Sequence, residues 1–203
     1  MSSEFWDQRF GAEEYVYGTK ANTFLAETLP GYVSPPADVV ELGAGEGRNA
    51  VFFAGKGYRV TALDYSRAGI EKTKRLAEQA GVAVEVVHAD VLRWRPERQW
   101  DAVLVAFLHL PPHARPEFYR KIRTILAPGG VLVAEWFRPE QITEGFRSGG
   151  PPRVEMMVTE EELRAHFPEA GIRRLESVTR TLGEGQHHSG PAAVVRLVWQ
   201  APD

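Results

Sequence analysis

The stretch "VVELGAGEGRN" (residues 39–49) decides the fold class. It is an apolar run that reaches a carboxylate, Glu41, and is followed by glycines at positions 43, 45 and 47. A glycine turn that leaves a strand and opens a helix lets backbone amides approach a ligand closely, and the helix N-terminus favours an anionic group. The alternative is a tight turn without a ligand, which three glycines at alternate positions make the weaker interpretation.

Short apolar runs alternate with helical segments on both sides of this turn. The pattern predicts strands at 37–42, 58–64, 83–90, 101–107 and 130–137, with helices at 20–29, 47–55, 66–80 and 113–126. Ser66 is the expected N-cap of the third of these helices, and Gly81 its expected end. Several strands are apolar throughout, as in a parallel sheet covered on both faces. The alternation therefore predicts a doubly wound α/β sheet.

The alternation of strands and helices ends after residue 137. Residues 138–153 are rich in glycine and proline and predict a long loop, of which 145–152 is a candidate lid over a site. Thr159 and Glu162 have the spacing of a capping box and predict a short helix. Two final strands, 172–182 and 192–200, flank "GEGQHHSG" (183–190) and should pair antiparallel, because no crossover helix fits between them.

Length and composition indicate a single domain and an ordinary soluble protein. The chain has 203 residues, 43% hydrophobic content, a net charge of −3 and no cysteine. A weakly acidic chain has no global basic field for nucleic acid or anionic membranes. The charged N-terminus lacks the apolar segment of a signal peptide, and the longest apolar run (102–108) is far too short to cross a bilayer. We expect a cytoplasmic protein.

The glycine spacing distinguishes two cofactors. A dinucleotide fingerprint would require glycine at position 48, where Arg48 stands. G-x-G-x-G preceded by Glu41 instead resembles motif I of class I S-adenosylmethionine-dependent methyltransferases. Asp64 ends the second predicted strand, Asp90 follows the third, and "LAPGGVLV" (126–133) resembles the turn before the fifth strand of that family.

The resemblance covers essentially the whole chain and implies a Rossmann-like, seven-stranded, mostly parallel sheet with a C-terminal antiparallel hairpin. It implies S-adenosylmethionine as the cofactor and S-adenosylhomocysteine as its product. It also implies three segments: a cap and helix (1–33), a cofactor-binding core (37–137) and an acceptor side (138–203). The implied cofactor-binding residues are Tyr17, Glu41, Gly43, Ala44, Gly45, Gly47, Arg48, Asn49, Asp64, Tyr65, Ser66, Ala89, Asp90, Val91 and Ala106.

A narrower resemblance is carried by four quoted segments. "FWDQRFGAEEYVYG" (5–18), "GEGRNAVFFAGKGYRVTALDYS" (45–66), "FLHLPP" (107–112) and "GEGQHHSG" look like the small tellurite-resistance-type methyltransferases, which are distantly similar to thiopurine methyltransferases. This subgroup implies a small-molecule acceptor with a soft or electron-rich atom. No nucleic-acid or membrane partner is expected, and the chain should be a monomer or a weak homodimer.

Four residues are the candidates for acceptor-side chemistry. Tyr17 precedes the first helix, His109 follows the fourth strand, Glu135 ends the fifth, and His188 lies in the terminal hairpin with Glu184. Each also has a structural interpretation, in core packing or at the surface. Pro111 and Pro112 prevent His109 and His113 from forming a helical metal pair, so no metal site is expected.

Three alternative functions remain at this stage. A nicotinamide-dependent oxidoreductase uses a similar sheet, although Arg48 argues against its fingerprint. A non-catalytic S-adenosylmethionine-binding protein would keep the donor site and lack turnover. A nucleic-acid methyltransferase is disfavoured by the net charge and by Leu110, which stands where an Asn or Asp would hold an amine.

Overall fold

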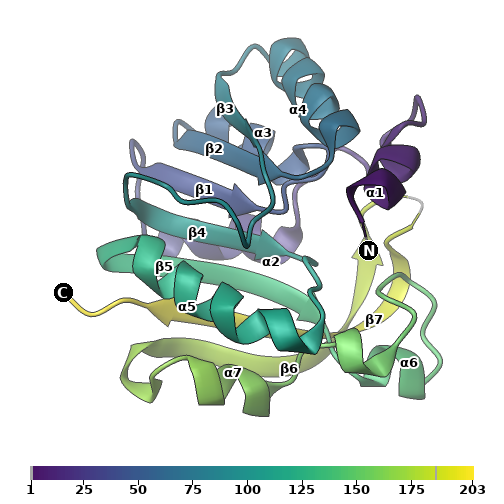
Figure 1. The fold of residues 1–203 in the computed structure, drawn as a ribbon, viewed down its shortest axis with the longest axis vertical. Coiled ribbons are helices and arrows are strands. Elements are labelled where there is room, and N and C mark those ends of the chain that lie inside the picture. The colour runs from purple at the N-terminus through teal and green to yellow at the C-terminus, as the bar shows by residue number, and fades with distance from the viewer. Residues whose placement is uncertain (1, 186) are drawn as a thin grey trace.

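A seven-stranded sheet runs through the computed structural model, which describes residues 2–185 and 187–203 (Figure 1). The strand order is β3-β2-β1-β4-β5-β7-β6, in which β7 runs antiparallel to both of its neighbours and the other pairs are parallel. The strands are β1 (Asp38–Leu42), β2 (Arg59–Asp64), β3 (Val84–His88), β4 (Trp100–Ala106), β5 (Leu126–Phe137), β6 (Ile172–Gly183) and β7 (Ser189–Gln200). The predicted Rossmann-like sheet with an antiparallel C-terminal hairpin is thus confirmed.

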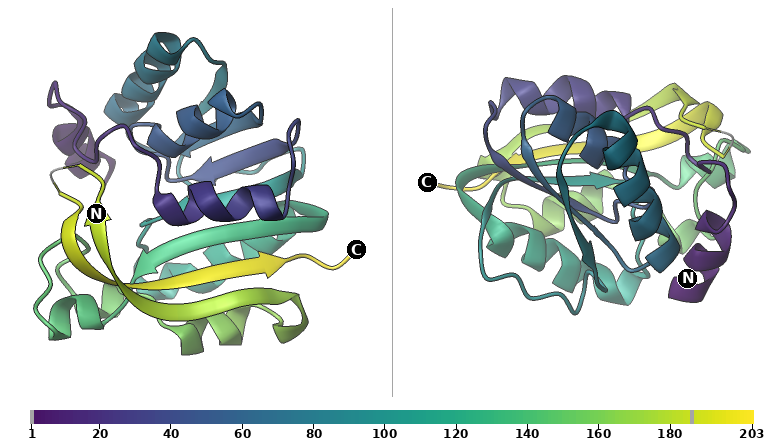
Figure 2. Two further views of the ribbon diagram at one scale, coloured as in Figure 1. Left: turned by 180° about the vertical axis from the view of Figure 1, so that it is seen from behind. Right: turned by 90° about the horizontal axis from the view of Figure 1, so that it is seen from above.

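Helices cover both faces of this sheet. They are α1 (Ser3–Phe10), α2 (Thr23–Thr28), α3 (Arg48–Gly55), α4 (Arg67–Ala80), α5 (Arg115–Ile125), α6 (Glu140–Thr143) and α7 (Glu160–His166), with 3-10 turns at Leu29–Gly31, Pro112–Ala114, Val154–Met156 and Glu169–Gly171. Figure 1 shows α5 and α7 in front of the sheet, and the left view of Figure 2 shows α2 and α3 on the opposite face. The described helices include none that is long and apolar enough to span a bilayer.

The apolar strands are explained by this double coverage. In β1, Val39 packs in the core on the α2–α3 face and Val40 in the core under α5, and both are fully buried. Leu42 of β1 pairs with Leu63 of β2, so both strands end at the same edge. The residues that follow, Gly43 and Asp64, are therefore brought side by side, although 20 positions separate Gly43 from Leu63.

Helix capping follows the predicted chemistry. The Ser66 side chain accepts a hydrogen bond from the Gly69 N–H, Thr159 caps α7 through the Glu162 N–H, and Gly81 ends α4 with φ 65°. Several elements differ from expectation. The N-terminal helix α1, capped by Ser2, was not predicted, because its sequence is polar and aromatic rather than periodic.

The helix expected at 20–29 is shorter. It begins after Asn22, whose side chain accepts from the Leu25 N–H and so fixes the start of α2 at Thr23, three residues later than expected. The loop expected at 138–153 contains the short helix α6. The division into a cap, a core and an acceptor side stays a prediction.

Candidate functional site

The glycine loop after β1 is held by backbone hydrogen bonds to β2. The N–H groups of Gly43 and Ala44 both donate to the Leu63 carbonyl at 2.9 Å. The Gly45 N–H donates to Oδ2 of Asp64 at 2.8 Å. Residues 43–45 therefore lie against the carboxyl end of the neighbouring strand, and Asp64 is locked beside them.

Gly47 excludes a side chain for a reason that differs from the expected one. It begins α3 with φ 86°, and a Cβ at this position would lie 2.6 Å from Cγ2 of Thr73 on α4. No alanine fits there without moving α3 away from α4. Here the missing side chain allows two helices to approach, rather than making room for a ligand.

The first two glycines face apolar side chains from outside the loop. A Cβ on Gly43 would lie 3.0 Å from Leu108, and a Cβ on Gly45 would lie 3.3 Å from the Phe10 ring. Phe10 belongs to α1 and Leu108 to the turn after β4, so two distant segments border the loop. Both glycines have positive φ, 75° and 57°.

Glu41 lies beneath this loop and is almost completely buried. Its Oε1 accepts from Nδ2 of Asn49 at 2.6 Å, whereas its buried Oε2 has no partner among the described residues. Burial raises the pKa of this carboxyl to about 7, against the opposing effects of Asn49 and of the Arg48 charge. A buried, half-satisfied carboxylate below a glycine loop is suited to a cationic group.

Asp64 accepts backbone hydrogen bonds through both oxygens, since Oδ1 also receives the Ser66 N–H at 2.8 Å. Burial raises its pKa. Ser66, the next candidate, donates its hydroxyl to Oδ1 of Asp7 at 2.7 Å. It therefore joins α1 to the start of α4. A carboxylate offers about four acceptor positions, so Asp64 keeps capacity for ligand hydroxyls.

A groove of about 610 Å³ lies beside Asp64 and is bordered by Tyr65, Ala89 and Asp90, together with Ser3 of α1. Burial raises the pKa of the Tyr65 phenol to about 12, so the group is neutral. Asp90 caps the turn that follows it by accepting the Leu92 N–H at 2.8 Å. Val91 does not border the groove and packs in the core under α5.

Tyr17 lies in the N-terminal segment that crosses this edge. Its N–H donates to Glu46 in the glycine loop at 3.3 Å, and its hydroxyl accepts from Arg9 at 3.1 Å. Lys72 of α4 forms a buried 2.8 Å ion pair with Glu46 and donates to the Glu14 carbonyl. The segment is therefore anchored directly on motif I. Burial raises the pKa of the Tyr17 phenol.

A buried hydrogen-bond network links motif I to the terminal hairpin. Nδ2 of Asn22 donates to Glu135 at 2.8 Å and to Glu184 at 3.3 Å, and the Asn22 N–H donates to Asn49 at 2.7 Å. Arg48 forms a 2.7 Å ion pair with Glu184. Arg48 thus reaches the acceptor side of the site and does not point into the glycine loop.

Two further arginines neutralise this network. Arg196 of β7 donates to Glu135 at 2.7 Å, and Arg180 of β6 lies 3.6 Å from Glu135 and pairs with Glu184. Glu135 is fully buried, with both oxygens engaged. Its surroundings are those of a structural ion-pair centre, so its role as a base stays a prediction.

His109 joins β5 to the segment before α7. Nδ1 lies 3.0 Å from the Met156 carbonyl, and Nε2 accepts the Phe137 N–H at 3.2 Å. This pairing requires the neutral tautomer with hydrogen on Nδ1. Burial lowers the pKa of the imidazole to about 4. Both ring nitrogens serve the fold, which favours a positioning role for His109.

An aromatic cluster surrounds His188. Its ring centroid lies 4.4 Å from that of Tyr17, 4.6 Å from Phe107 and 5.4 Å from Phe137. The ring is buried, its Nδ1 has no partner among the described residues, and burial lowers its pKa to about 3. The cluster brings together Tyr17 and His188, two of the acceptor-side candidates, and His109 stacks on Phe137 at 5.8 Å.

Phe107 was missed by the sequence analysis. It follows Ala106 at the end of β4 and has φ 56°, which is rare for a residue with a side chain. Its ring stacks on Phe137 at 4.5 Å. Asn22 was missed too, and its position before "TFLAET" was a capping signal that could have found it. Nothing in the sequence marks the strain at Phe107.

The candidate lid at 145–152 is attached to the rest of the chain. Gln141 of α6 donates to Ser148 at 3.1 Å and to the Gly149 carbonyl at 3.0 Å, and it accepts the Ala193 N–H of β7. A Cβ on Gly149 would lie 2.6 Å from the His188 ring. The segment therefore covers the aromatic cluster. Gln186 lies outside the described residues, and within them no three His, Asp or Glu side chains are grouped to hold a metal ion.

The comparisons with known proteins agree with this geometry. Residues 39–130 match the model of a family described as a methyltransferase domain. No curated protein matches the chain significantly. Many solved structures share the fold.

Three of these structures are informative. The structure reported for conversion of a disulfide bond into a thioacetal group during echinomycin biosynthesis has a TM-score of 0.79 at 17% identity, covering 98% of this chain and 91% of its own. TehB from Haemophilus influenzae has a TM-score of 0.72 at 14% identity, covering 98% and 66%. A Burkholderia thailandensis 1,6-didemethyltoxoflavin-N1-methyltransferase, with its acceptor and S-adenosylhomocysteine bound, has a TM-score of 0.63 at 23% identity, covering 88% and 76%. The chain therefore has the fold of the class I S-adenosylmethionine-dependent methyltransferases, and its residues 39–130 match a methyltransferase domain.

Proposed function

We propose that this chain is an S-adenosylmethionine-dependent methyltransferase that acts on a small molecule through a soft or electron-rich acceptor atom. The observation that carries the proposal is the glycine loop, fixed against Asp64 at the adjacent ends of β1 and β2, with the unpaired Oε2 of Glu41 below it. The matched methyltransferase domain spans the same residues and weakens the nicotinamide alternative.

The polar groups at this edge fit the parts of the donor. Glu41 suits the methionine ammonium, because a neighbouring cation would supply the partner that its Oε2 lacks and would favour ionisation of a carboxyl whose pKa is raised to about 7. Asp64 suits the ribose hydroxyls. The groove at Tyr65, Ala89 and Asp90 suits the adenine.

S-adenosylmethionine supplies an activated methyl group on a sulfonium centre, so the protein mainly positions the acceptor and excludes water. The cluster of Tyr17, Phe107, Phe137 and His188 is the proposed acceptor-side wall, with Ala106 at its strand end. His109 and Glu135 are engaged in structural hydrogen bonds. This favours an acceptor that needs no deprotonation during transfer, such as a soft atom.

The finer assignments belong to the same proposal. The shared fold with TehB supports the tellurite-resistance-type subgroup, and the bound acceptor of the Burkholderia enzyme supports a small molecule. We place the protein in the cytoplasm as a monomer or weak homodimer, without nucleic-acid or membrane partners.

Titration calorimetry with S-adenosylhomocysteine tests the proposal. We expect saturable binding that Asp64→Asn weakens about tenfold or more, because hydrogen bonds to a charged group contribute about 1.5–3 kcal/mol. Asp38→Asn is the matched control. Asp38 is the first residue of β1, at the end of the strand away from the glycine loop, and it pairs with the exposed Arg59. Absence of any heat of binding to folded wild-type protein would refute the proposal.

His109 and Glu135 are both held in hydrogen bonds within the fold, and this also favours one alternative, a non-catalytic S-adenosylmethionine-binding protein. Labelled methyl transfer to a panel of thiols, heterocyclic amines and metalloid oxyanions separates the two. Transfer to any member establishes the enzyme. Tight donor binding with no transfer across the panel supports the non-catalytic function.

A further inference from the structure

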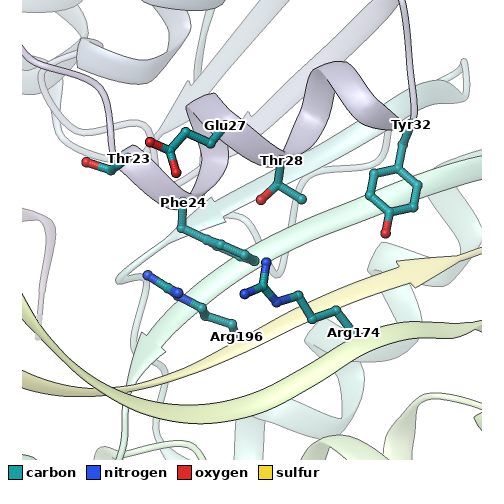
Figure 3. Close-up of a pocket in the computed structure, with 7 residues that line it drawn as sticks. All are labelled: Thr23, Phe24, Glu27, Thr28, Tyr32, Arg174 and Arg196. Carbon is teal, nitrogen blue, oxygen red and sulfur yellow. The ribbon is translucent and has the colours of Figure 1, made fainter.

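A second pocket lies on the face of the sheet that carries α2, away from the glycine loop. Its volume is about 340 Å³, and it is bounded by α2 on one side and by β6 and β7 on the other. Figure 3 shows the ring of Phe24, which descends from α2 toward the guanidinium groups of Arg174 and Arg196. None of these residues takes part in the proposed methyl transfer.

The two guanidinium groups share one aromatic ring. Arg196 lies 4.6 Å and Arg174 5.4 Å from the centroid of Phe24, which is itself buried. Contact with the ring holds the two guanidinium groups in place while their nitrogen atoms can still donate hydrogen bonds. Two cations are thus held close together at the surface.

Their protein partners leave part of the hydrogen-bonding capacity of the two guanidinium groups available. Both arginines contact the same oxygen of Glu176, Arg174 through Nη2 at 2.6 Å and Arg196 through Nη1 at 3.3 Å. Arg196 uses Nε for Glu135. Among the contacts of the described residues, Nη1 of Arg174 and Nη2 of Arg196 remain for a ligand.

The other lining groups define the chemistry further. The Thr23 and Thr28 side chains of α2 contribute hydroxyl groups, which donate readily to an anion. Glu27 lines the same pocket and brings one negative charge against the two positive ones. Glu176 and Glu135 already pair with these arginines, so the pocket offers guanidinium and hydroxyl donors on two walls rather than a net positive charge.

We propose that this pocket binds a small molecule through a carboxylate or phosphate oxyanion, held by Arg174 and Arg196 and by the α2 hydroxyls. A guanidinium group can donate two parallel hydrogen bonds to either oxyanion, and the volume is that of a small-ligand pocket. Because Arg196 is already fixed by Phe24 and Glu135, binding orders mainly the half-exposed Arg174. The proposal does not depend on methyltransferase activity.

The test is titration of the full-length protein with inorganic phosphate and, separately, with succinate, followed by NMR or calorimetry. We expect saturable binding that Arg174→Gln weakens about tenfold, from the loss of a charge-assisted contact. Glu27→Gln should tighten binding about threefold by removing the like charge. The tightening cannot arise from damaged folding, which would weaken binding.

Arg173→Gln is the matched control, because Arg173 is the preceding residue of β6 and its side chain pairs instead with the half-buried Gln200. It should leave the affinity unchanged. Saturating S-adenosylhomocysteine should not displace the probe. The proposal is overturned if neither probe binds wild-type protein saturably, if Arg173→Gln weakens binding as much as Arg174→Gln, if Glu27→Gln fails to tighten it, or if the nucleoside displaces the probe.

Discussion

The two halves of the candidate site are built in different ways. The donor side is a backbone structure, in which the amides of residues 43–45 meet β2 within a short stretch of chain. The acceptor side is a side-chain structure, in which Asn22, Glu135 and Glu184 meet from three distant segments. The difference teaches that local sequence specifies the first half, whereas the second depends on every strand keeping its register.

The largest loss of stability should come from removing a side chain of the buried network on the acceptor side. Glu135→Ala leaves Arg196 without its buried partner and Arg180 with Glu184 alone, and removing one member of a buried ion pair costs about 3–5 kcal/mol. Chemical denaturation should show this loss. Glu176→Ala removes a partly exposed partner of the same Arg196 and should cost less than about 1 kcal/mol. Equal losses would mean that burial does not distinguish the two carboxylates.

A side chain added to the glycine loop of the donor side should cause the next largest loss of stability. Gly47→Ala places a Cβ 2.6 Å from Thr73 at a left-handed φ, so we expect a loss of about 2–4 kcal/mol in the free energy of unfolding. Gly55→Ala, in the same helix, has no neighbour within 4 Å and should be neutral or slightly stabilising. A mild Gly47→Ala phenotype in denaturation would show that α3 and α4 can separate easily.

Measuring stability against pH separates the two sides of the site, because their titratable groups contribute to the free energy of unfolding with opposite pH dependence. The His109 pKa falls from 6.5 to about 4 on folding, so its contribution is present above pH 6.5 and is lost as pH falls toward 4. Glu41 has its pKa raised to about 7, so its neutral form stabilises the fold at low pH, and this contribution is lost as pH rises through 7. Burial also lowers the pKa of His188, so its contribution to stability, like that of His109, is lost as the pH falls.

His109→Asn isolates one of these contributions, since asparagine cannot titrate and its amide can still donate to Met156. Between pH 6.5 and 4, stability of the wild type relative to the variant should fall by about 1.4 kcal/mol per pH unit. Denaturation midpoints measured across this range give the slope. Parallel curves for the two proteins would mean that His109 titrates normally in the fold.

The smallest effect concerns the contact between the halves. Tyr17→Phe removes the hydroxyl that accepts from Arg9 and should cost about 0.5–1 kcal/mol, while the ring keeps its contact with His188. Donor affinity should stay within about twofold of wild type. A larger loss of affinity in calorimetry would place the Tyr17 hydroxyl on the donor.

Much of the fold could be predicted from local patterns. The strands around residues 39 and 60 are mostly apolar, the helix at 67–80 has Ser66 and Gly81 at its ends, and the terminal hairpin has too little chain for a crossover. The exceptions were the short helix α6 in the expected loop and, near the N-terminus, α1 and the exact start of α2. Both depend on single capping residues, Ser2 and Asn22, rather than on periodicity.

The candidate site was predicted less evenly. Glu41, Asp64 and the glycines follow from strand ends and turn chemistry, but the contact of Gly47 with Thr73 required the packing of two helices. His109 and His188 were placed near the acceptor side by position alone. Their hydrogen bonds and low pKa values come from burial by residues far away in the chain.

The sequence by itself determined the order of strands and helices and the glycine turn, because periodicity and turn geometry are properties of adjacent residues. Tertiary structure decided which charges meet. Arg196 lies opposite Glu135 on β5 and opposite Glu176 on β6 only in the observed register, and a slip of one residue would turn it to the other face of the sheet. Register is set by the packing of the whole sheet, which no short stretch of sequence contains.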